Sequence, residues 1–264
     1  MSEYKIGEYD ITEIQAVMLE ILTEIDRICV KHNIKYILDG GTMIGAVRHN
    51  GFIPWDDDLD IAMLREDYEK LMEVCKSELS DRFLWHSAEL EAKHPLNFTK
   101  LRKKGTVYKE RRFASLGLEQ GIFIDIFPID NVNRKTMKFQ LALLSFIHIV
   151  KFTKMKLYKK KKRIFLLPFC LIPKKTLDRW AKKLMVMGNK KKSDEVYKFC
   201  HPGKMKPVYP RSLYEDVIRH PFCGKEFYIP RDYDLFLKER YGDYMQLPPE
   251  EKRIMAHGVV ECRL

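Results

Sequence analysis

The feature that most constrains the fold is an alternation of helical and strand-like segments over residues 1–135. Apolar side chains recur at helical spacing over 12–31 and again over 66–79, which predicts two amphipathic helices. Short apolar runs bounded by turn residues predict strands at 35–38, 59–63, two positions within 97–109, and 121–127. This alternation is typical of a mixed sheet with helices packed on it, so we predict an α+β fold.

Three local boundaries follow from the same pattern. Thr12 and Gln15 have the spacing of a capping box at the start of the first helix. The two strands within 97–109 are expected around a turn at 103–105. Pro128 is expected to close the last of the predicted strands.

Beyond residue 135 the composition changes. Residues 136–200 are mostly helical in pattern and basic, whereas 201–264 are rich in Pro, Tyr and Gly, with one helix predicted near 232–241. We therefore predict a catalytic core over 1–135, a basic helical insertion over 136–200, and a C-terminal segment over 201–264 that packs back on the core.

The net charge is unevenly distributed. The chain of 264 residues has 48 Lys and Arg against 37 Asp and Glu, a formal charge of +11. Residues 151–192 hold 16 of the basic residues and one acid, Asp178, so this stretch carries +15 and the remainder −4. Excess positive charge favours an anionic partner, and its confinement predicts that this stretch, not the core, meets that partner.

Several classes of protein are disfavoured. With 45% hydrophobic and 32% charged residues the chain can bury a core, which excludes a wholly disordered protein. The opening MSEYKIGEYD has no apolar secretory segment, and the longest apolar runs, 139–150 and 164–172, are shorter than the roughly 18 residues of a spanning helix. No C-x-x-C pair is present, and one loose cluster matches no compact zinc spacing: Cys200, His201, His220 and Cys223. We expect a cytosolic protein with reduced thiols.

A glycine pair marks the first candidate binding element. Gly40, Gly41 and Thr42 lie between a predicted strand and a brief predicted helix over 42–48. Glycines let backbone N–H groups approach a ligand, and a helix N-terminus favours a phosphate. A plain strand-to-helix turn would use the same residues, so this pattern alone is a weak indication.

An unusual density of carboxylates precedes the strand at 59–63. By alternation Asp58 and Asp60 project to one side of the strand. Two carboxylates this close repel each other unless a cation or a proton intervenes, and oxygen ligands with open positions suit Mg²⁺ or Mn²⁺. The other acids of the run fit a solvated acidic turn: Asp56 and Asp57.

A third carboxylate stands alone in the strand at 121–127. Asp125 shares one face with Phe123 and Phe127, and a buried carboxylate needs a cation, a hydrogen-bonding network or a proton. A structural Asp bonded to loop amides is one reading. On a strand adjacent to 59–63, Asp125 would instead complete a three-carboxylate metal cluster suited to in-line phosphoryl transfer.

These motifs resemble the LicD family of phosphocholine transferases, which also includes the fukutin-related transferases of other alditol phosphates. The resemblance lies, in this order, in YILDGGTMIGAVRHNGFIPWDDDLDIAMLREDYEKLMEVC (36–75), GIFIDIFPID (121–130) and YGDYMQLPPEEKRIMAHG (241–258). It implies a nucleotidyltransferase-like fold. The segment between the glycine pair and the acids is longer than in minimal nucleotidyltransferases, and the resemblance leaves Arg48 and His49 in it without a defined role.

The resemblance also implies a reaction: transfer of phosphocholine from CDP-choline to a hydroxyl of a cell-surface glycan precursor of the teichoic acid, capsule or lipopolysaccharide type, releasing CMP. The implied cofactor is Mg²⁺ or Mn²⁺. The residues it places at the metal are Asp58, Asp60 and Asp125, the last also as base toward the acceptor hydroxyl. The residues it places at the donor phosphates are Gly40, Gly41 and Thr42.

Further residues are candidates for donor and acceptor contacts. Lys100 and Arg102 share one strand face and are candidates to pair with donor phosphates, although solvated surface charges would show the same pattern. In the tail, Arg253 and His257 lie four residues apart in the segment that resembles the family, and the resemblance makes them candidates for a substrate or leaving-group contact; ordinary surface residues are the alternative. Choline is a quaternary ammonium that aromatic faces recognise, and the aromatic candidates are Trp55, Tyr241 and Tyr244.

The basic stretch has two readings. A run of cations flanked by apolar segments has the composition of an interfacial anchor on an anionic leaflet: Lys159, Lys160, Lys161, Lys162 and Arg163. This reading predicts a protein peripheral at the inner face of the cell membrane, and the alternative is a helical insertion with a solvated Lys face. No nucleic-acid partner is expected, because the run lacks interleaved aromatic residues.

Three other functions fit parts of the pattern. The same fold could use CDP-ribitol, CDP-glycerol or CDP-ethanolamine. A metal-dependent glycosyltransferase also uses Asp-x-Asp after an apolar strand, although the glycine pair and Asp125 argue against it. A non-catalytic scaffold for envelope assembly would need neither the carboxylates nor a nucleotide.

Overall fold

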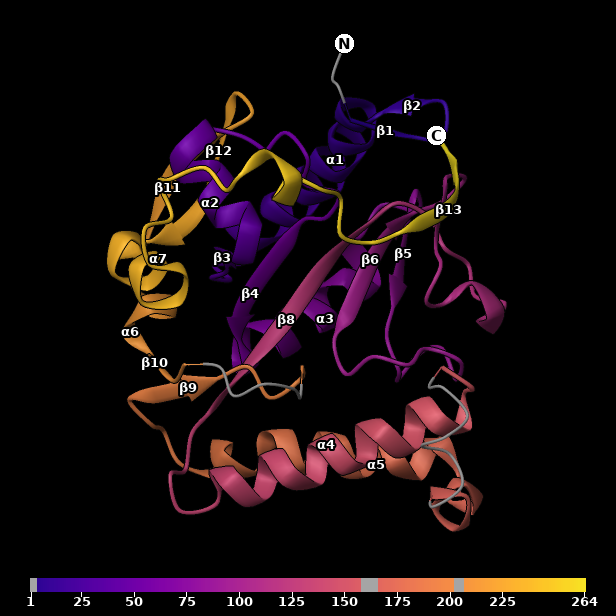
Figure 1. Ribbon diagram of the computed structural model, residues 1–264. Helices are drawn as coiled ribbons and strands as arrows, with labels where there is room; N and C mark the ends of the chain where they lie inside the picture. Colours follow the sequence, from indigo (N-terminus) through magenta and orange to yellow (C-terminus); the bar gives the residue numbers. More distant parts are fainter. Residues whose placement is uncertain (1–3, 158–165, 202–206) are drawn as a thin grey trace.

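Figure 1 shows the computed structural model, in which residues 4–157, 166–201 and 207–264 are described. The fold is α+β, as predicted, with a mixed sheet at its centre. Helices α1 (Ile11–Lys31) and α3 (Arg65–Glu78) both pack against the central strand β8 (Phe123–Asn131). The main core lies between these two helices and the sheet, because each helix turns a stripe of buried apolar side chains toward the sheet.

The central sheet is organised around β8. Strand β4 (Asp60–Leu64) runs parallel to β8, and β6 (Thr99–Lys103) runs antiparallel on the other side. All nine residues of β8 are buried, and six of them are apolar, as is typical of a strand covered on both faces. The same sheet includes the outer strands β3 (Ile37–Leu38), β5 (Phe83–His86), β9 (Glu195–Tyr197) and β10 (Tyr209–Pro210).

Strand β8 continues through Pro128, so the prediction that this proline closes the strand is wrong. The N–H of Asp125 points toward β4, where it donates to the Leu59 carbonyl (2.8 Å). By alternation, the N–H that Pro128 lacks would point to the opposite side of β8. The neighbouring strand there has already ended, at the pair Thr99 with Ile126, so the proline removes no bond to β6.

Helix α1 begins one residue earlier than predicted. Asp10 is its N-cap and accepts from the Thr12 N–H (3.0 Å), while the Glu13 carboxylate accepts from the Asp10 N–H (2.9 Å). The capping box predicted for Thr12 and Gln15 is therefore wrong, because the cap lies two residues upstream. Gln15 instead donates its side-chain amide to the Asp56 carbonyl (2.9 Å), which ties α1 to the acidic run.

The two strands predicted within 97–109 are present but do not pair with each other. Strand β6 pairs with β5 and β8. Strand β7 (Val107–Glu110) pairs with β13 (Val259–Arg263), close to the end of the chain. The turn between β6 and β7, with Gly105 at φ +80°, therefore leads the chain out of the central sheet.

The basic segment folds into a helical pair, drawn below the sheet in Figure 1. Helix α4 (Met137–Lys154) packs on α5 (Lys174–Met185), and 3-10 turns flank α5 at η4 (Pro168–Leu171) and η5 (Val186–Lys190). Among the described residues, no helix has the length and apolar character that crossing a membrane requires. The run Lys159–Arg163 lies outside the described residues.

The C-terminal part begins with a hairpin that was not predicted. Strands β11 (Val217–Phe222) and β12 (Lys225–Pro230) are joined by Cys223 (φ 50°) and Gly224 (φ 74°). Both turn residues are left-handed, as a type I′ turn requires, but Cys is an unusual choice at the first of them. The hairpin packs on β3 and on α2 (Gly40–His49), so this part of the chain lies against the core.

The helix predicted near 232–241 is present as α7 (Tyr233–Tyr241). From its end the chain crosses the sheet near the starts of β4 and β8, as the yellow segment of Figure 1 shows. The predicted division into parts at residues 135 and 200 stays a prediction. The remaining short elements are β1 (Lys5–Ile6), β2 (Tyr9–Asp10), η1 (Ala114–Leu116), α6 (Ser212–Glu215) and η6 (Glu250–Lys252).

Candidate functional site

Three aspartates gather near the starts of β4 and β8. Asp60 is the first residue of β4 and is paired in register with Asp125 on the parallel strand β8. Asp58 precedes Asp60 by two residues, and its charge acts on Asp60 together with that of Asp125. The structure therefore brings together the three carboxylates that the sequence analysis assigned to a metal. We call Asp58, Asp60 and Asp125 the acidic cluster.

These carboxylates are crowded and under-bonded. Burial raises the pKa of Asp58 to about 8, and the charge of Asp56 adds to the effect. Burial also raises the pKa of Asp60 well above its ordinary value, with the charges of Asp58 and Asp125 contributing. Within the described residues, the buried Oδ1 of Asp60 has no hydrogen-bond partner. A cation bound here would relieve both the repulsion and the missing contact.

The glycine pair is explained by the approach of these acids. A Cβ on Gly40, which has φ +60°, would lie 3.0 Å from Asp60 Oδ2, and one on Gly41 would lie 2.7 Å from Asp56 Oδ2. Thr42 then accepts a hydrogen bond from the Asp60 N–H on its hydroxyl oxygen (2.9 Å). The element predicted to bind phosphate thus also lets the N-terminus of α2 lie directly against the acidic cluster.

The two predicted phosphate-binding cations are buried beside the cluster. Lys100 Nζ lies 3.0 Å from Asp125 Oδ1 and 3.6 Å from Glu110 Oε2, above the ring of Phe123. Arg102 donates to the Gly121 carbonyl (2.7 Å) and to a ring nitrogen of His86 (3.1 Å). Lys100 is therefore in contact with the cluster, whereas Arg102 is turned toward protein partners and its phosphate contact stays a prediction.

Asp57 was interpreted as part of a solvated turn, and this is wrong. Its side chain is buried and accepts hydrogen bonds from the backbone N–H groups of Ala256 (2.9 Å) and His257 (3.1 Å). Tyr108 donates its hydroxyl to the same carboxylate (3.2 Å). Asp57 therefore anchors the C-terminal tail over the acidic cluster, a role invisible in the sequence because its partners lie about 200 residues away.

His257 is drawn into the site by this anchor. Its Nδ1 lies 3.2 Å from Asp57 Oδ1, and its Nε2 lies 3.8 Å from Asp58 Oδ2. Burial alone would lower the pKa of His257, but the hydrogen bond to Asp57 and the charge of Asp58 outweigh it and raise the pKa to about 9. The contact with Asp57 therefore favours the protonated imidazole. Arg253, by contrast, donates to the Pro248 carbonyl (2.9 Å) and stacks over Trp55.

A second set of cations reaches the cluster from distant segments. Asp39, the residue before Gly40, is fully buried and pairs with Lys198 and, at 2.6 Å, with Arg240 of α7. Burial would raise the pKa of Asp39, but these two cations hold it well below the usual range. The charge of Lys198 also acts on Asp60. No local sequence signal identifies these residues, because they meet only through the folded sheet.

The aromatic residues predicted for choline line one cavity of about 380 Å³. Trp55, Tyr241 and Tyr244 contribute to its wall, together with Asp243 and Arg48. This cavity adjoins the acidic cluster: a Cβ on Gly40 would lie 3.9 Å from the Tyr241 hydroxyl and 3.0 Å from Asp60. Three aromatic side chains and the carboxylate of Asp243 therefore line a cavity beside the acidic cluster, and Arg253 already lies over the Trp55 ring.

The groups that fit a metal ion best are two carboxylates, Asp58 and Asp60. In the part of the chain that is described, no set of three or more His, Cys, Asp or Glu side chains has the arrangement of a metal site, and this covers the described members of the Cys200 cluster. Asp125 already has Lys100 as a counter-charge. The unbonded Oδ1 of Asp60 and the crowding of Asp58 fit a hard cation with oxygen ligands and open positions.

Comparison with known proteins identifies the family of this chain. The profile of the LicD/FKTN/FKRP nucleotidyltransferase domain matches residues 33–175, more than half of the chain. The lipopolysaccharide cholinephosphotransferase LicD of Haemophilus influenzae is 29% identical over 259 residues, covering 93% of this chain and 95% of that protein.

Two other similarities differ in extent. An uncharacterised protein of Rickettsia prowazekii is 26% identical over 228 residues, covering 75% of this chain and 84% of the relative. Ribitol 5-phosphate transferase FKRP of Homo sapiens is 47% identical over 34 residues, which are 13% of this chain and 7% of that protein.

Proposed function

Because the chain belongs to the LicD/FKTN/FKRP nucleotidyltransferase family, we propose that it transfers phosphocholine from CDP-choline to a hydroxyl group of a cell-surface glycan precursor and releases CMP. The observation that carries the choice of donor is the cavity of Trp55, Tyr241 and Tyr244 beside the acidic cluster. Aromatic faces attract a quaternary ammonium through their ring quadrupoles, and Asp243 adds a carboxylate at the same cavity. The cholinephosphotransferase relative supports phosphocholine as the transferred group.

The metal in this proposal is Mg²⁺ or Mn²⁺, held by Asp58 and Asp60 with Asp125 alongside. When bound, such an ion supplies positive charge to the donor diphosphate and orients it for displacement. The fit rests on the raised pKa values of Asp58 and Asp60 and on the unbonded Asp60 oxygen.

The protein's own groups bind and orient the donor. The N-terminus of α2 at Gly40, Gly41 and Thr42 presents backbone N–H groups, which favour a phosphate. Lys198 and the His257 cation add positive charge on two sides of the acidic cluster. The Trp55 cavity then receives the choline group, which fixes the phosphorus between these cations.

Asp125 is the base in the proposed step. It takes the proton of the acceptor hydroxyl as that oxygen forms a bond to the phosphocholine phosphorus, and the bond from this phosphorus to the CMP oxygen breaks. Lys100, 3.0 Å away, keeps the Asp125 carboxylate available to accept the proton by opposing the effect of burial on its pKa.

Thermal-shift titration with activated donors tests the donor directly. With Mg²⁺ present, CDP-choline should raise the Tm more than CDP-ribitol, CDP-glycerol, CDP-ethanolamine or a UDP-sugar. A larger shift with one of these rivals would replace phosphocholine in the proposal. No shift with any nucleotide, together with intact folding, would favour the non-catalytic scaffold.

CDP-ribitol is the second candidate donor, because a 34-residue segment is 47% identical to a ribitol 5-phosphate transferase. The two donors differ in how they depend on the aromatic cavity. If choline is the natural group, replacing Trp55 by Leu should weaken the binding of CDP-choline. Ribitol has no cation, so if ribitol is the natural group the same change should leave the binding of CDP-ribitol unchanged.

We also propose that the basic insertion holds the enzyme at the inner face of the cell membrane. Its described part exposes apolar side chains beside its cations, including Phe139, Phe169 and Leu171, the last 84% exposed. Replacing Lys159–Arg163 by neutral residues should reduce sedimentation with anionic liposomes. Unchanged sedimentation would contradict the proposal.

A further inference from the structure

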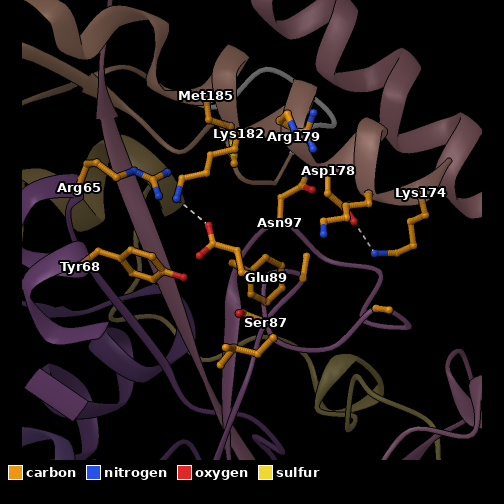
Figure 2. Close-up of a pocket in the computed structure, with 15 residues that line it drawn as sticks. Arg65, Tyr68, Ser87, Glu89, Asn97, Lys174, Asp178, Arg179, Lys182 and Met185 are labelled. Carbon is orange, nitrogen blue, oxygen red and sulfur yellow. Dashed lines mark hydrogen bonds and ion pairs between the residues drawn. The ribbon is translucent and has the colours of Figure 1, made fainter. Parts of the chain in front are cut away.

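A cavity separate from the acidic cluster lies between α5 and the loop joining β5 to β6, and Figure 2 shows its lining. Its volume is about 490 Å³, within the usual range for small-molecule sites. Arg65, which directly follows β4, lines it, whereas Asp60 at the other end of β4 belongs to the acidic cluster. Strand β4 itself runs four residue steps, from Asp60 to Leu64, which is about 13 Å.

The wall of this cavity carries excess positive charge. Five cationic and two acidic residues line it, and both acids are already paired: Glu89 with Lys182 (2.6 Å) and Asp178 with Lys174 (2.6 Å). Asp178 also receives the buried Lys151 from α4 (2.6 Å). A third lining cation, Arg65, is held in a buried pair by Asp130. The remaining two, Lys175 and Arg179, have no ion pair with any described residue.

The opposite wall is mainly apolar. Figure 2 places Tyr68 and Ser87 across from α5, and Leu90 and Phe98 line the same cavity. Ser87 Oγ is buried and has no hydrogen-bond partner within the described residues. A buried hydroxyl without a partner is uncommon, and a ligand that fills the cavity would supply one.

We propose that this cavity binds an anionic amphiphile, a molecule with a phosphate or carboxylate group on an apolar body. The anionic group meets Lys175 and Arg179, whose charges are otherwise uncompensated, and accepts the Ser87 hydroxyl proton. The apolar body covers Leu90 and Phe98. The site is distinct from the donor site and does not depend on which donor the enzyme uses.

Titration calorimetry with decyl phosphate, below its critical micelle concentration, tests this. The variant Lys175→Ala/Arg179→Ala should bind about tenfold or more weakly than the unmodified protein, because charge-assisted contacts are lost. The matched control Lys183→Ala/Lys191→Ala removes the same charge from exposed positions outside the cavity and should keep its affinity within about twofold.

Two variants test the position of the ligand without removing a cation. Ala88→Phe fills the cavity and should abolish binding, and Leu90→Asp, at a side chain that is 65% exposed, should repel the anion and weaken it. Inorganic phosphate and decyltrimethylammonium should bind at least about tenfold more weakly than decyl phosphate, because each lacks one half of the recognised chemistry.

The proposal is overturned if the two double variants bind decyl phosphate equally, if neither Ala88→Phe nor Leu90→Asp weakens it, or if inorganic phosphate binds as tightly. Circular dichroism spectra that match the unmodified protein show that each variant is folded. A failed test would leave the donor site untouched, because no residue changed here contacts the acidic cluster.

Discussion

Strand β8 carries two buried aspartates, Asp125 near its start and Asp130 near its end, and the two have different surroundings. Asp130 accepts two parallel hydrogen bonds from Arg65 (2.8 and 2.8 Å) and one from Asn189 (2.7 Å). Asp125 instead has one lysine beside it and shares its end of the sheet with two further carboxylates. The fully bonded Asp130 fixes α3 to β8. The acidic cluster at the other end, in which Asp60 Oδ1 has no partner among the described residues, has bonding capacity left for a cation and a substrate. The state of hydrogen bonding thus separates a structural end from a reactive end of the same strands.

The largest effect is expected at the reactive end. Asp60→Asn should lower the rate of CMP release by about a thousandfold or more, since an amide cannot neutralise the metal. The Tm should stay equal or rise, because an amide in this crowded, buried position cannot ionise and so cannot repel Asp58 and Asp125. Single-turnover kinetics and a thermal melt measure the two quantities. Retained activity would show that Asp60 is as structural as Asp130.

The next largest effect is expected at the structural end. Arg65→Met leaves the buried Asp130 without its counter-charge and should lower the free energy of unfolding by about 3–5 kcal/mol in urea denaturation. The control Arg231→Met breaks an exposed pair with Asp216 and should cost under about 1 kcal/mol. Equal losses in the two variants would contradict the distinction between the ends.

The pH dependence of stability should belong to the reactive end. The folded state keeps Asp58 protonated up to about pH 8, whereas the unfolded chain releases that proton near the ordinary value of 3.8. The folded state likewise holds the proton of His257 up to about 9, against an ordinary value of 6.5. In both cases the folded protein binds more protons, so the free energy of unfolding falls as pH rises through these windows.

Thermal melts in EDTA check this expectation. The Tm should fall between about pH 5 and pH 9, and Mg²⁺ should raise it more at about pH 8 than at pH 5.5, because the metal replaces the lost protons. Asp58→Asn should flatten the profile, and Arg65→Met should shift it downward without changing its shape. A flat profile in the unmodified protein would contradict the crowding of the cluster.

The smallest of these effects concerns the aromatic cavity. Trp55→Leu should raise KM for CDP-choline by about tenfold, as loss of one cation–π contact is worth roughly 1–2 kcal/mol. Inhibition by CMP, which has no choline group, should be unchanged. If both quantities move together, Trp55 supports the turn rather than the ligand.

Local sequence was sufficient for the two strands that form the site. Asp60 and Asp125 each stand beside or within an apolar run, where a buried carboxylate needs a cation, a hydrogen-bonding network or a proton. Asp130, in the same run, meets this need with structural partners. The residues alone did not show that β4 and β8 are adjacent, and only the family resemblance implied it. The ends of the strands were predicted less well. Pro128 was expected to end β8 because a proline cannot donate a hydrogen bond to a neighbouring strand, but β6 stops before that point, so no such bond is lost.

Residues joined by long-range contacts could not be predicted. Asp57 looks like any acid in a polar turn until Ala256 and His257 are placed over it, and Lys198 looks like one more lysine of a basic stretch until it meets Asp39. Each of these pairs spans more than 150 residues of sequence. Propensity and spacing describe neighbours along the chain, so they carry no information on such partners.

The anchoring of the tail on Asp57 bears on how the protein is made. A ribosome adds about 5–20 residues per second, so the partners of Asp57, 199 and 200 residues further on, appear roughly 10–40 s after it. Arg65 meets Asp130 after only 65 residues. A nascent chain can therefore pair Arg65 with Asp130 well before Ala256 and His257 close over the acidic cluster.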